Sequence, residues 1–206
     1  MMQVLIVTGG IGSGKSEVCR IIQDAFDCGV YNADARVKML YDNHPSLLDD
    51  IEAELGTALR DSDGKFIPSR LAQCIFNDKE KLQVVEGLVF PALIEDFELW
   101  KAGYADDDFV VFESATVLEK PQFKGFGDKV ILVDAPFQIR LERASRRDGV
   151  AKNMIYSRMM NQVMMNKISD GEIDPGTDAV IHNDCTLDEL HQQVLLTIER
   201  LYGKIN

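Results

Sequence analysis

The sequence of 206 residues is poor in side chains that bind soft metal ions, with only four cysteines and three histidines. No two cysteines form a Cys-x-x-Cys pair, and the histidines lack the spacing of zinc ligands, which argues against a zinc site. We therefore expect buried or neutral thiols in a reducing compartment, and hence a cytoplasmic protein. The cysteines are Cys19, Cys28, Cys74 and Cys185.

Long apolar runs and a basic leader are also missing. The longest apolar stretches, such as residues 130–133, have the length of a strand and not of a membrane span. Met1-Met2-Gln3 supplies no positive charge before the first apolar run, so we expect no signal peptide. The net charge of −12 disfavours binding to nucleic acid or to an anionic membrane, because both attract a basic surface. It does not exclude a small polyanionic ligand, which backbone N–H groups and a few side chains can hold.

Apolar runs and helical patterns alternate in the first and last parts of the chain. Five apolar runs predict strands, at residues 3–8, 28–32, 109–113, 129–134 and 179–182. Apolar residues at helical spacing predict helices at 16–26, 136–147 and 186–202. The strands lack alternation of apolar and polar residues, which is typical of strands covered on both faces. This order predicts an α/β fold with a parallel sheet and right-handed crossovers.

Two segments interrupt the alternation. Helical patterns follow one another at residues 34–41, 46–55, 69–76 and 79–101, which predicts a helical subdomain of residues 34–104 that could hold a second substrate. The core would then comprise residues 1–33 and 105–206. Within it, residues of about 146–178 are polar and rich in methionine, and we expect either a mobile lid or a surface helix whose methionines fill the core.

The stretch GGIGSGKSE, residues 9–17, follows the first predicted strand and opens the first predicted helix. It fits the pattern Gly-x-x-x-x-Gly-Lys-Ser/Thr, with Gly9, Gly14, Lys15 and Ser16 at the fixed positions. Glycines let the backbone N–H groups of such a loop face a phosphate, and the helix N-terminus adds partial positive charge. Lys15 can reach the β- and γ-phosphates, and Ser16 can hold a magnesium ion that bridges them. The loop therefore predicts that the protein binds a nucleoside triphosphate.

Three further features bear on the fate of the triphosphate, and each has an alternative. Asp34 follows the second predicted strand, where it could accept a hydroxyl proton or merely cap the next helix. Glu113 ends the third predicted strand, where a magnesium or water contact and an ordinary strand-end carboxylate both stay open. Arg140, Arg143 and Arg147 share one helix face, and they either clamp the transferring phosphoryl group or form a solvated surface.

Five stretches, in order and over most of the chain, resemble the dephospho-coenzyme A (dephospho-CoA) kinase family. They are TGGIGSGKS at 8–16, NAD at 32–34, RLAQCIFNDKEKLQVVEGLVFPALI at 70–94, RLERASRRDG at 140–149 and DAVIHND at 178–184. The resemblance implies a P-loop kinase fold, in which a parallel five-stranded sheet flanked by helices carries a helical coenzyme-binding insertion and a lid. It also implies phosphorylation of the 3′-hydroxyl of dephospho-CoA by ATP and Mg²⁺, the last step of coenzyme A synthesis.

The motif and the resemblance together assign roles to single residues. The resemblance makes Asp34 the base, and it places the segment around Asn183 near the adenine. The expected catalytic residues are Asp34, Lys15, Arg143 and Arg147, with Ser16 as the metal ligand. The expected ATP-binding residues are Gly10, Ile11, Gly12, Ser13, Gly14, Lys15, Ser16, Glu17 and Asn183.

The chain departs from the family pattern at three named positions. Asn32 stands where the family usually has aspartate, Phe90 where it usually has histidine, and Glu17 where threonine or serine is common. Two alternatives therefore accompany the expected function. One is another small-molecule or nucleotide P-loop kinase, and the other is a nucleotide-binding regulator that has lost turnover. The sequence leaves the oligomeric state open.

Overall fold

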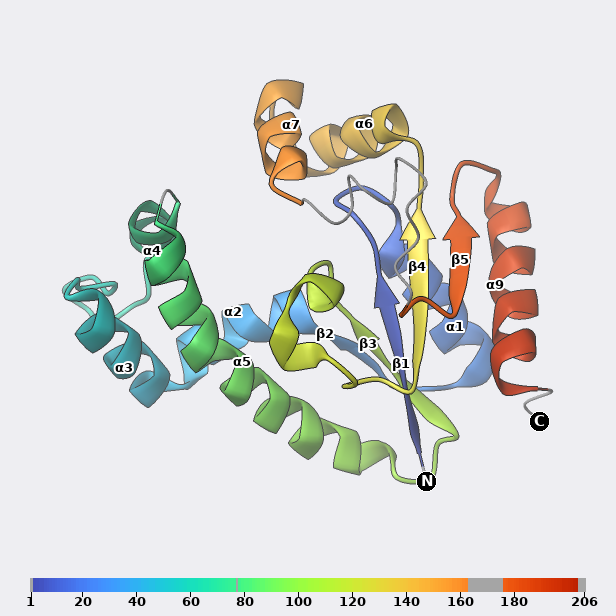
Figure 1. Ribbon diagram of the computed structural model, residues 1–206, viewed down its shortest axis with the longest axis horizontal. Helices are drawn as coiled ribbons and strands as arrows, with labels where there is room; N and C mark the ends of the chain where they lie inside the picture. The colour runs from blue at the N-terminus through green and yellow to red at the C-terminus, as the bar shows by residue number, and fades with distance from the viewer. Residues whose placement is uncertain (1, 77, 163–175, 204–206) are drawn as a thin grey trace. The chain divides into compact units, whose positions relative to one another are not determined.

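The computed structural model describes residues 2–76, 78–162 and 176–203, and Figure 1 shows the helices and strands along the chain. The strands are β1 (Gln3–Thr8), β2 (Val30–Asn32), β3 (Phe109–Glu113), β4 (Lys129–Asp134) and β5 (Ala179–His182). The helices are α1 (Lys15–Phe26), α2 (Ala33–Asn43), α3 (Pro45–Leu55), α4 (Pro68–Ile75), α5 (Lys79–Lys101), α6 (Phe137–Asp148), α7 (Lys152–Met160) and α9 (Leu187–Tyr202). Three short 3₁₀ turns are η1 (Ala102–Tyr104), η2 (Val117–Glu119) and η3 (Pro121–Phe123).

The five strands form one parallel sheet in the order β2-β3-β1-β4-β5, which confirms the predicted five-stranded parallel sheet. β1 lies at the centre, with Gln3 opposite Phe109 of β3 and Leu5 opposite Lys129 of β4. Because the strands run in one direction, their carboxyl ends meet at one edge of the sheet. In open α/β sheets, ligands bind outside this edge.

Apolar side chains fill the core between one face of the sheet and the helices α1 and α9. Leu5 and Val7 of β1 belong to one buried cluster with Val18 of α1 and Val194 of α9. α1 and α9 also pack against each other, and both are visible beside the sheet in Figure 1. The cluster explains why these segments carry apolar residues at strand and helix spacing.

The segment between β3 and β4 contributes aromatic rings to the core. Phe112 of β3 lies 5.9 Å from Phe123 and 4.9 Å from Phe126, measured between ring centroids. Phe112 neighbours Val111, a member of the α1–α9 cluster, and successive residues of a strand point to opposite faces. The aromatic rings therefore cover the other face of β3.

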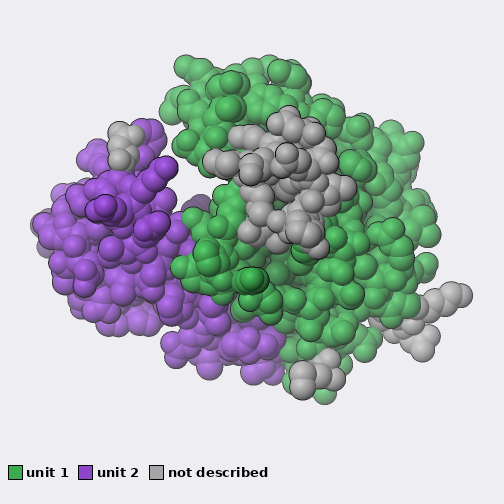
Figure 2. All heavy atoms as spheres, viewed as in Figure 1, with its two compact units in different colours: residues 1–32, 104–206 green, residues 33–103 purple. Residues whose placement is uncertain are grey.

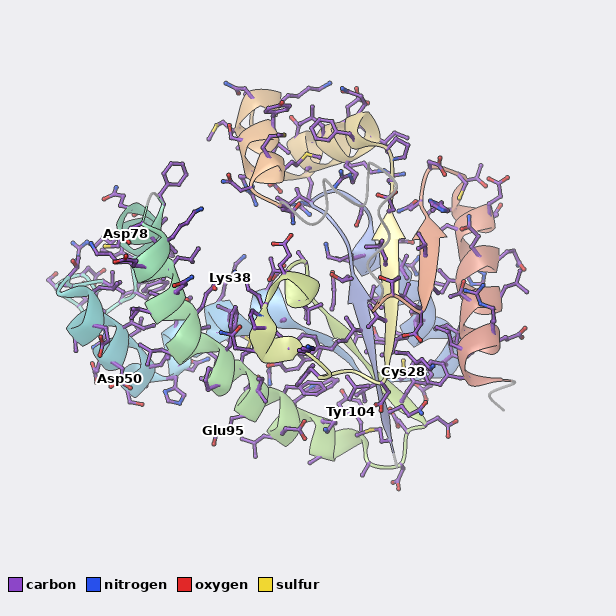
Figure 3. The ribbon with its side chains drawn as sticks, viewed as in Figure 1. Cys28, Lys38, Asp50, Asp78, Glu95 and Tyr104 are labelled. Atoms are coloured by element: carbon purple, nitrogen blue, oxygen red, sulfur yellow. The ribbon has the colours of Figure 1, made fainter. Side chains whose placement is uncertain are left out.

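Contacts within the chain divide it into two compact units, which Figure 2 colours separately. Unit 1 comprises residues 1–32 and 104–206 and holds the sheet, whereas unit 2 comprises residues 33–103. Within unit 2, α5 packs against α2, α3 and α4. Arg36 of α2 donates two hydrogen bonds, of 2.8 and 3.1 Å, to Asp96 of α5. Asp78, labelled in Figure 3, caps α5 by accepting the backbone N–H of Lys81.

Several element ends differ slightly from the sequence prediction. β2 begins at Val30 and not at residue 28, because α1 ends with Asp27 in the left-handed conformation (φ 46°) and the chain must turn before it can pair. α9 begins at Leu187, because Thr186 forms a capping box with Glu189 and is the N-cap. These shifts move no residue to another element.

The expected lid of about residues 146–178 is described only in part. Residues 163–175, which include Met164 and Met165, lie outside the described residues. The described part contains α7, a helix that fits either expectation. Met159 of α7 is buried, whereas Met154 and Met160 are 58% and 47% exposed. Of these three methionines, one fills the core.

Two kinds of feature are absent from the residues that the structure describes. Within residues 2–76, 78–162 and 176–203, no helix is both long and apolar enough to cross a membrane. The same residues hold no group of three or more His, Cys, Asp or Glu side chains that could bind a metal ion.

Candidate phosphate-binding site

The phosphate loop, residues 9–16, runs from the end of β1 into the first turn of α1 and follows a path that favours glycine. Gly12 and Gly14 have φ angles of 78° and 98°, in the left-handed region that other residues rarely adopt. A Cβ would also collide with the backbone of Arg140 at Gly12 and with the side-chain amide of Asn183 at Gly14. Gly14 is the N-cap of α1, so the loop carries the positive end of that helix. This geometry suits an anion.

Two buried amide side chains from distant segments hold the backbone of the loop. Gln162 accepts a hydrogen bond of 2.8 Å from the N–H of Ile11 through its Oε1 atom. Asn183 donates a hydrogen bond of 2.8 Å from its Nδ2 atom to the carbonyl of Ser13. Gln162 and Asn183 are 7% and 6% exposed. Because buried hydrogen bonds are costly to break, they fix the loop in this shape.

Arg140 brings a buried positive charge to the same loop. Its side chain is 1% exposed, and its guanidinium lies so close to Gly10 that a Cβ there would collide with it. Burial lowers the pKa of Arg140, and the carboxylate of Asp134 opposes that shift. The guanidinium carbon lies 5.8 Å from the centre of the Phe137 ring. An arginine stays protonated in proteins, so its charge favours an anion bound at the loop.

Lys15 lies over the loop. Its Nζ atom donates to the carbonyls of Gly9 at 2.9 Å and Gly10 at 3.4 Å. An ammonium group forms stronger hydrogen bonds with a charged phosphate oxygen than with a neutral carbonyl. Lys15 can therefore turn from these carbonyls to a phosphate without leaving the loop.

Glu113, at the carboxyl end of β3, accepts a hydrogen bond on each oxygen. Ser16 donates from Oγ to Oε1 at 2.7 Å, and Asn32 donates from Nδ2 to Oε2 at 2.7 Å. Glu113 is 6% exposed, so these bonds orient a buried carboxylate beside the loop. A serine hydroxyl that donates its proton to Glu113 keeps its lone pairs available for a cation. An ionised aspartate at position 32 could not donate as Asn32 does.

The oxygen atoms beside the loop fit a magnesium ion that arrives with a nucleotide. Mg²⁺ prefers oxygen ligands, retains several waters and usually binds one or two protein groups together with substrate phosphates. Ser16 offers a hydroxyl oxygen, and Glu113 offers a carboxylate that accepts from that hydroxyl. This donor set is small, which agrees with the absence of a larger acidic cluster from the described residues.

The three arginines of α6 that the sequence places on one face have different surroundings. Arg140 is buried against the loop, as described above. Arg143 donates a hydrogen bond of 2.8 Å to the backbone carbonyl of Asn183. The side chain of Arg147 is 63% exposed, and it forms an ion pair of 2.7 Å with Asp148. The structure thus brings Arg140 and Arg143 to the support of the loop and leaves Arg147 largely in solvent.

Glu17 and Asp34, the acidic residues with expected roles, lie on different helices. Glu17 of α1 pairs with Arg20 at 2.6 Å, and the hydrogen bond from Arg20 lowers the pKa of Glu17. Asp34 is exposed in the first turn of α2, the first helix of unit 2. It follows Asn32, the last residue of β2, by two positions. The chain therefore passes directly from a residue that contacts Glu113 to the expected base.

Sequence reasoning placed Arg140 on the arginine face of α6 without assigning it to the loop, and it missed the role of Gln162. Arg140 carries a signal, because it belongs to the buried stripe of α6 together with Leu141 and Ala144. An arginine on an apolar stripe indicates a buried charge with a specific purpose. Gln162 carries no such signal, since its partner Ile11 lies 151 positions away in the chain.

The known proteins to which this chain is similar include dephospho-CoA kinases. A family model described as dephospho-CoA kinase matches residues 3–189. A dephospho-CoA kinase of Porphyromonas gingivalis is 38% identical over 156 residues, which cover 76% of this chain and 75% of that protein. A crystal structure of a Thermus thermophilus protein has a TM-score of 0.80 at 24% identity, covering 98% of this chain and 99% of that one. A dephospho-CoA kinase structure from Campylobacter jejuni has a TM-score of 0.58 at 20% identity, covering 97% of both chains.

Proposed function

The chain belongs to the dephospho-CoA kinase family, and on that premise we propose how its residues divide the work of the reaction. The enzyme transfers the γ-phosphoryl group of ATP to the 3′-hydroxyl of dephospho-CoA. The hydroxyl oxygen forms a bond to the γ-phosphorus, the bond from this phosphorus to the bridging oxygen breaks, and ADP leaves. The hydroxyl proton passes to a base.

The phosphate loop binds and orients the triphosphate. Its backbone N–H groups and the N-terminus of α1 face the phosphates, and Lys15 opposes the charge on the transferring group. Ser16 would hold the magnesium ion, whose charge neutralises the phosphates when it is bound. Glu113 orients Ser16, because it accepts the serine proton. Asn183 and Glu17 complete the nucleotide site, Asn183 through its bond to the loop and Glu17 at the start of α1.

Asp34 accepts the hydroxyl proton. Its carboxylate is exposed, whereas both oxygens of Glu113 already accept hydrogen bonds from side chains. A general base needs a lone pair within hydrogen-bond reach of the proton that it takes. Asp34 also belongs to unit 2, the helical residues 33–103 to which we assign the acceptor.

Arg143 and Arg147 stabilise the charge on the transferring phosphoryl group. Guanidinium groups suit this task, because they stay protonated and offer paired N–H donors. Arg143 starts from a half-buried position against Asn183, and Arg147 from a solvated position at the end of α6. We further propose that residues of about 146–178 act as the lid and that the protein works in the cytoplasm with reduced thiols.

The observation that carries the proposal is the preformed phosphate loop. Its backbone is held by Gln162 and Asn183, and a buried arginine lies against it. Phosphoryl transfer depends mainly on position and on electrostatic stabilisation, so a loop fixed before the nucleotide arrives favours turnover. A regulator that only senses nucleotide has less need for this support.

A coupled assay that measures ADP release tests the function directly. With ATP, Mg²⁺ and dephospho-CoA, we expect ADP to form in step with coenzyme A. Thermal shift separates the alternatives, because a ligand at a hundred times its Kd adds about 2.7 kcal/mol to stability. A kinase of dephospho-CoA is stabilised by the acceptor as well as by ATP. Stabilisation by nucleotide alone, without ADP release, would contradict the proposal and favour a regulator.

A further inference from the structure

β2 is an edge strand of the sheet, and its last residue lies beside the buried carboxylate of Glu113. The register of β2 and β3 places Tyr31 opposite Phe112 and Asn32 opposite Glu113. The rings of Tyr31 and Phe112 stack at a centroid distance of 5.4 Å, which helps to hold this register. Because successive residues of a strand point to opposite faces, Asn32 and Glu113 share the other face of the sheet.

The side-chain amide of Asn32 satisfies one of the two oxygens of Glu113. Asn32 donates from Nδ2 to Oε2 at 2.7 Å, and Ser16 donates from Oγ to Oε1 at 2.7 Å. Glu113 is 6% exposed, so water is a poor substitute for either donor. A buried carboxylate oxygen that loses its donor is costly, and the side chain then rotates to find another. Asn32 therefore fixes which oxygen of Glu113 faces Ser16.

The orientation of Glu113 in turn decides where the hydroxyl proton of Ser16 points. A serine hydroxyl has one proton to donate and two lone pairs to offer. While the proton lies on Glu113, the lone pairs are available to a cation. If Glu113 turned away, the proton could point toward the cation and weaken its binding. Residues that orient a metal ligand in this manner typically change metal affinity or activity by about 10–100-fold when they are removed.

We propose that Asn32 is a positioning residue for the magnesium ion, and that it acts through Glu113 and Ser16 without contacting the metal. This inference rests on the proposed function, since it takes Ser16 as the metal ligand. Asn32 is also a position at which the chain departs from the usual family pattern of aspartate. An ionised aspartate would place a second carboxylate against Glu113, whereas the amide supplies a donor.

The response of ATP affinity to Mg²⁺ tests this role without depending on turnover. We call the ratio of the Kd for ATP without Mg²⁺ to the Kd with Mg²⁺ the magnesium gain, and we expect it to exceed one in the wild type. Asn32→Leu removes the donor at similar size and should lower the magnesium gain by about fivefold or more. The Kd for ATP in EDTA should stay within about twofold, because the phosphate loop is intact.

Two further variants separate the lost donor from a disturbed fold. Asn43→Leu is the matched control, because it makes the same change at the exposed last residue of α2, and it should keep the wild-type magnesium gain. Asn32→Ala removes the same donor with a smaller side chain and should reproduce the effect of Asn32→Leu if the latter does not fold. Thermal unfolding without ligands measures the stability of each variant separately.

A double-mutant cycle tests whether Asn32 acts through Glu113. Glu113→Ala removes the carboxylate that Asn32 orients. In that background, Asn32→Leu should change the magnesium gain by less than about twofold, because no carboxylate remains to be oriented. The KM for dephospho-CoA gives a second readout, and Asn32→Leu should leave it within about twofold while kcat falls by about tenfold.

The outcomes separate this inference from the proposed function. An unchanged magnesium gain in folded Asn32→Leu or Asn32→Ala would overturn the inference, and Asn32 would then only hold β2 against β3. An equal effect of Asn32→Leu in the wild type and in Glu113→Ala would also overturn it. Both results leave the proposed function intact. A wild-type enzyme that releases no ADP with dephospho-CoA, or whose ATP affinity does not respond to Mg²⁺, would overturn the proposed function and this inference with it.

Discussion

The phosphate loop of unit 1 and a pocket of about 430 Å³ in unit 2, between α2, α4 and the segment that precedes α4, are built in opposite ways. The loop is held by hydrogen bonds from Gln162 and Asn183 and has a buried arginine against it. The pocket has mostly apolar walls, and its two lysines, Lys38 and Lys65, form no ion pair with the described residues. One site is fixed by polar groups before a ligand arrives, whereas the other offers shape and loosely placed charge.

Because the two sites are built differently, we expect each unit to control a different kinetic constant. Groups fixed around a phosphate act on the transition state, in which charge and geometry change most, so their loss should lower kcat. Unit 2 is the unit to which we assign the acceptor, most of which does not react, so a loss of its apolar walls should raise the KM for that acceptor.

The largest effect is expected for Lys15→Ala in unit 1. Loss of this ammonium removes a charge that opposes the build-up on the transferring group, and we expect kcat to fall by about 10³-fold or more. Lys124→Ala is the control, because Lys124 is an exposed lysine between β3 and β4, outside the phosphate loop and the proposed lid. Steady-state kinetics and thermal unfolding measure the two variants. Near-normal turnover of a folded Lys15→Ala would contradict the assignment of the phosphate loop.

Asp34→Asn tests whether unit 2 contributes to the chemistry itself. Removal of a positioned base typically lowers the rate by about 10²–10⁴-fold, and we expect such a loss with ATP binding retained. The amide keeps the size of the side chain, so the variant should stay folded. ATP affinity and single-turnover rates are the measurements.

Glu113→Gln in unit 1 is the comparison for Asp34→Asn. Activity retained in Asp34→Asn and lost in Glu113→Gln would make Glu113 the base. Activity retained in both would mean that position alone carries the transfer and that no base is needed.

Arg143→Ala and Arg147→Ala test whether these arginines of α6 act on the transferring phosphoryl group. Each should lower kcat by about 100-fold and change ATP affinity much less, because the contact is made mainly in the transition state. Arg143→Ala should also lower the melting temperature, since Arg143 donates to the carbonyl of Asn183. Arg147→Ala should not, because its pair with Asp148 is exposed. Wild-type turnover in both variants would mean that Arg143 only supports the structure and that Arg147 is only a surface residue.

The smallest effect is expected for Phe90→His on α5 of unit 2. Phe90 is half-buried on α5, and a phenyl ring neither donates nor accepts a proton. We therefore expect the variant to be tolerated and kcat to change by less than about tenfold, or ~1.4 kcal/mol in the barrier. A gain above that value would show that the enzyme is impaired at this position.

Strands were the most predictable part of the fold. β1, β3, β4 and β5 match the predicted runs at both ends. Each is an apolar run bounded by polar or turn-forming residues, and both faces of the sheet are covered. Helix ends depend on single caps such as Thr186, which a periodic pattern does not locate.

The candidate site was predictable where local sequence defines it and hidden where it depends on distant contacts. The glycines, Lys15 and Ser16 lie within one short stretch, so the motif identifies them. The bonds from Gln162 to Ile11 and from Asn32 to Glu113 join residues that only the folded sheet brings together. No spacing rule applies to such pairs, because their distance in the chain is set by the length of the segments between them.

In the sequence, unit 2 is inserted between β2 and β3, and this has a consequence for the order of folding. β1 pairs with β3 and β4, so its partners are not synthesised until the whole of residues 33–103 has emerged. The contacts within unit 2 join residues of one continuous segment, and closing short loops costs less entropy than closing long ones. Unit 2 should therefore gain protection from hydrogen exchange before β1 during refolding, and simultaneous protection of both would contradict this order. On the ribosome, the helices of unit 2 would fold before β1, which precedes the phosphate loop, can pair with β3 and β4.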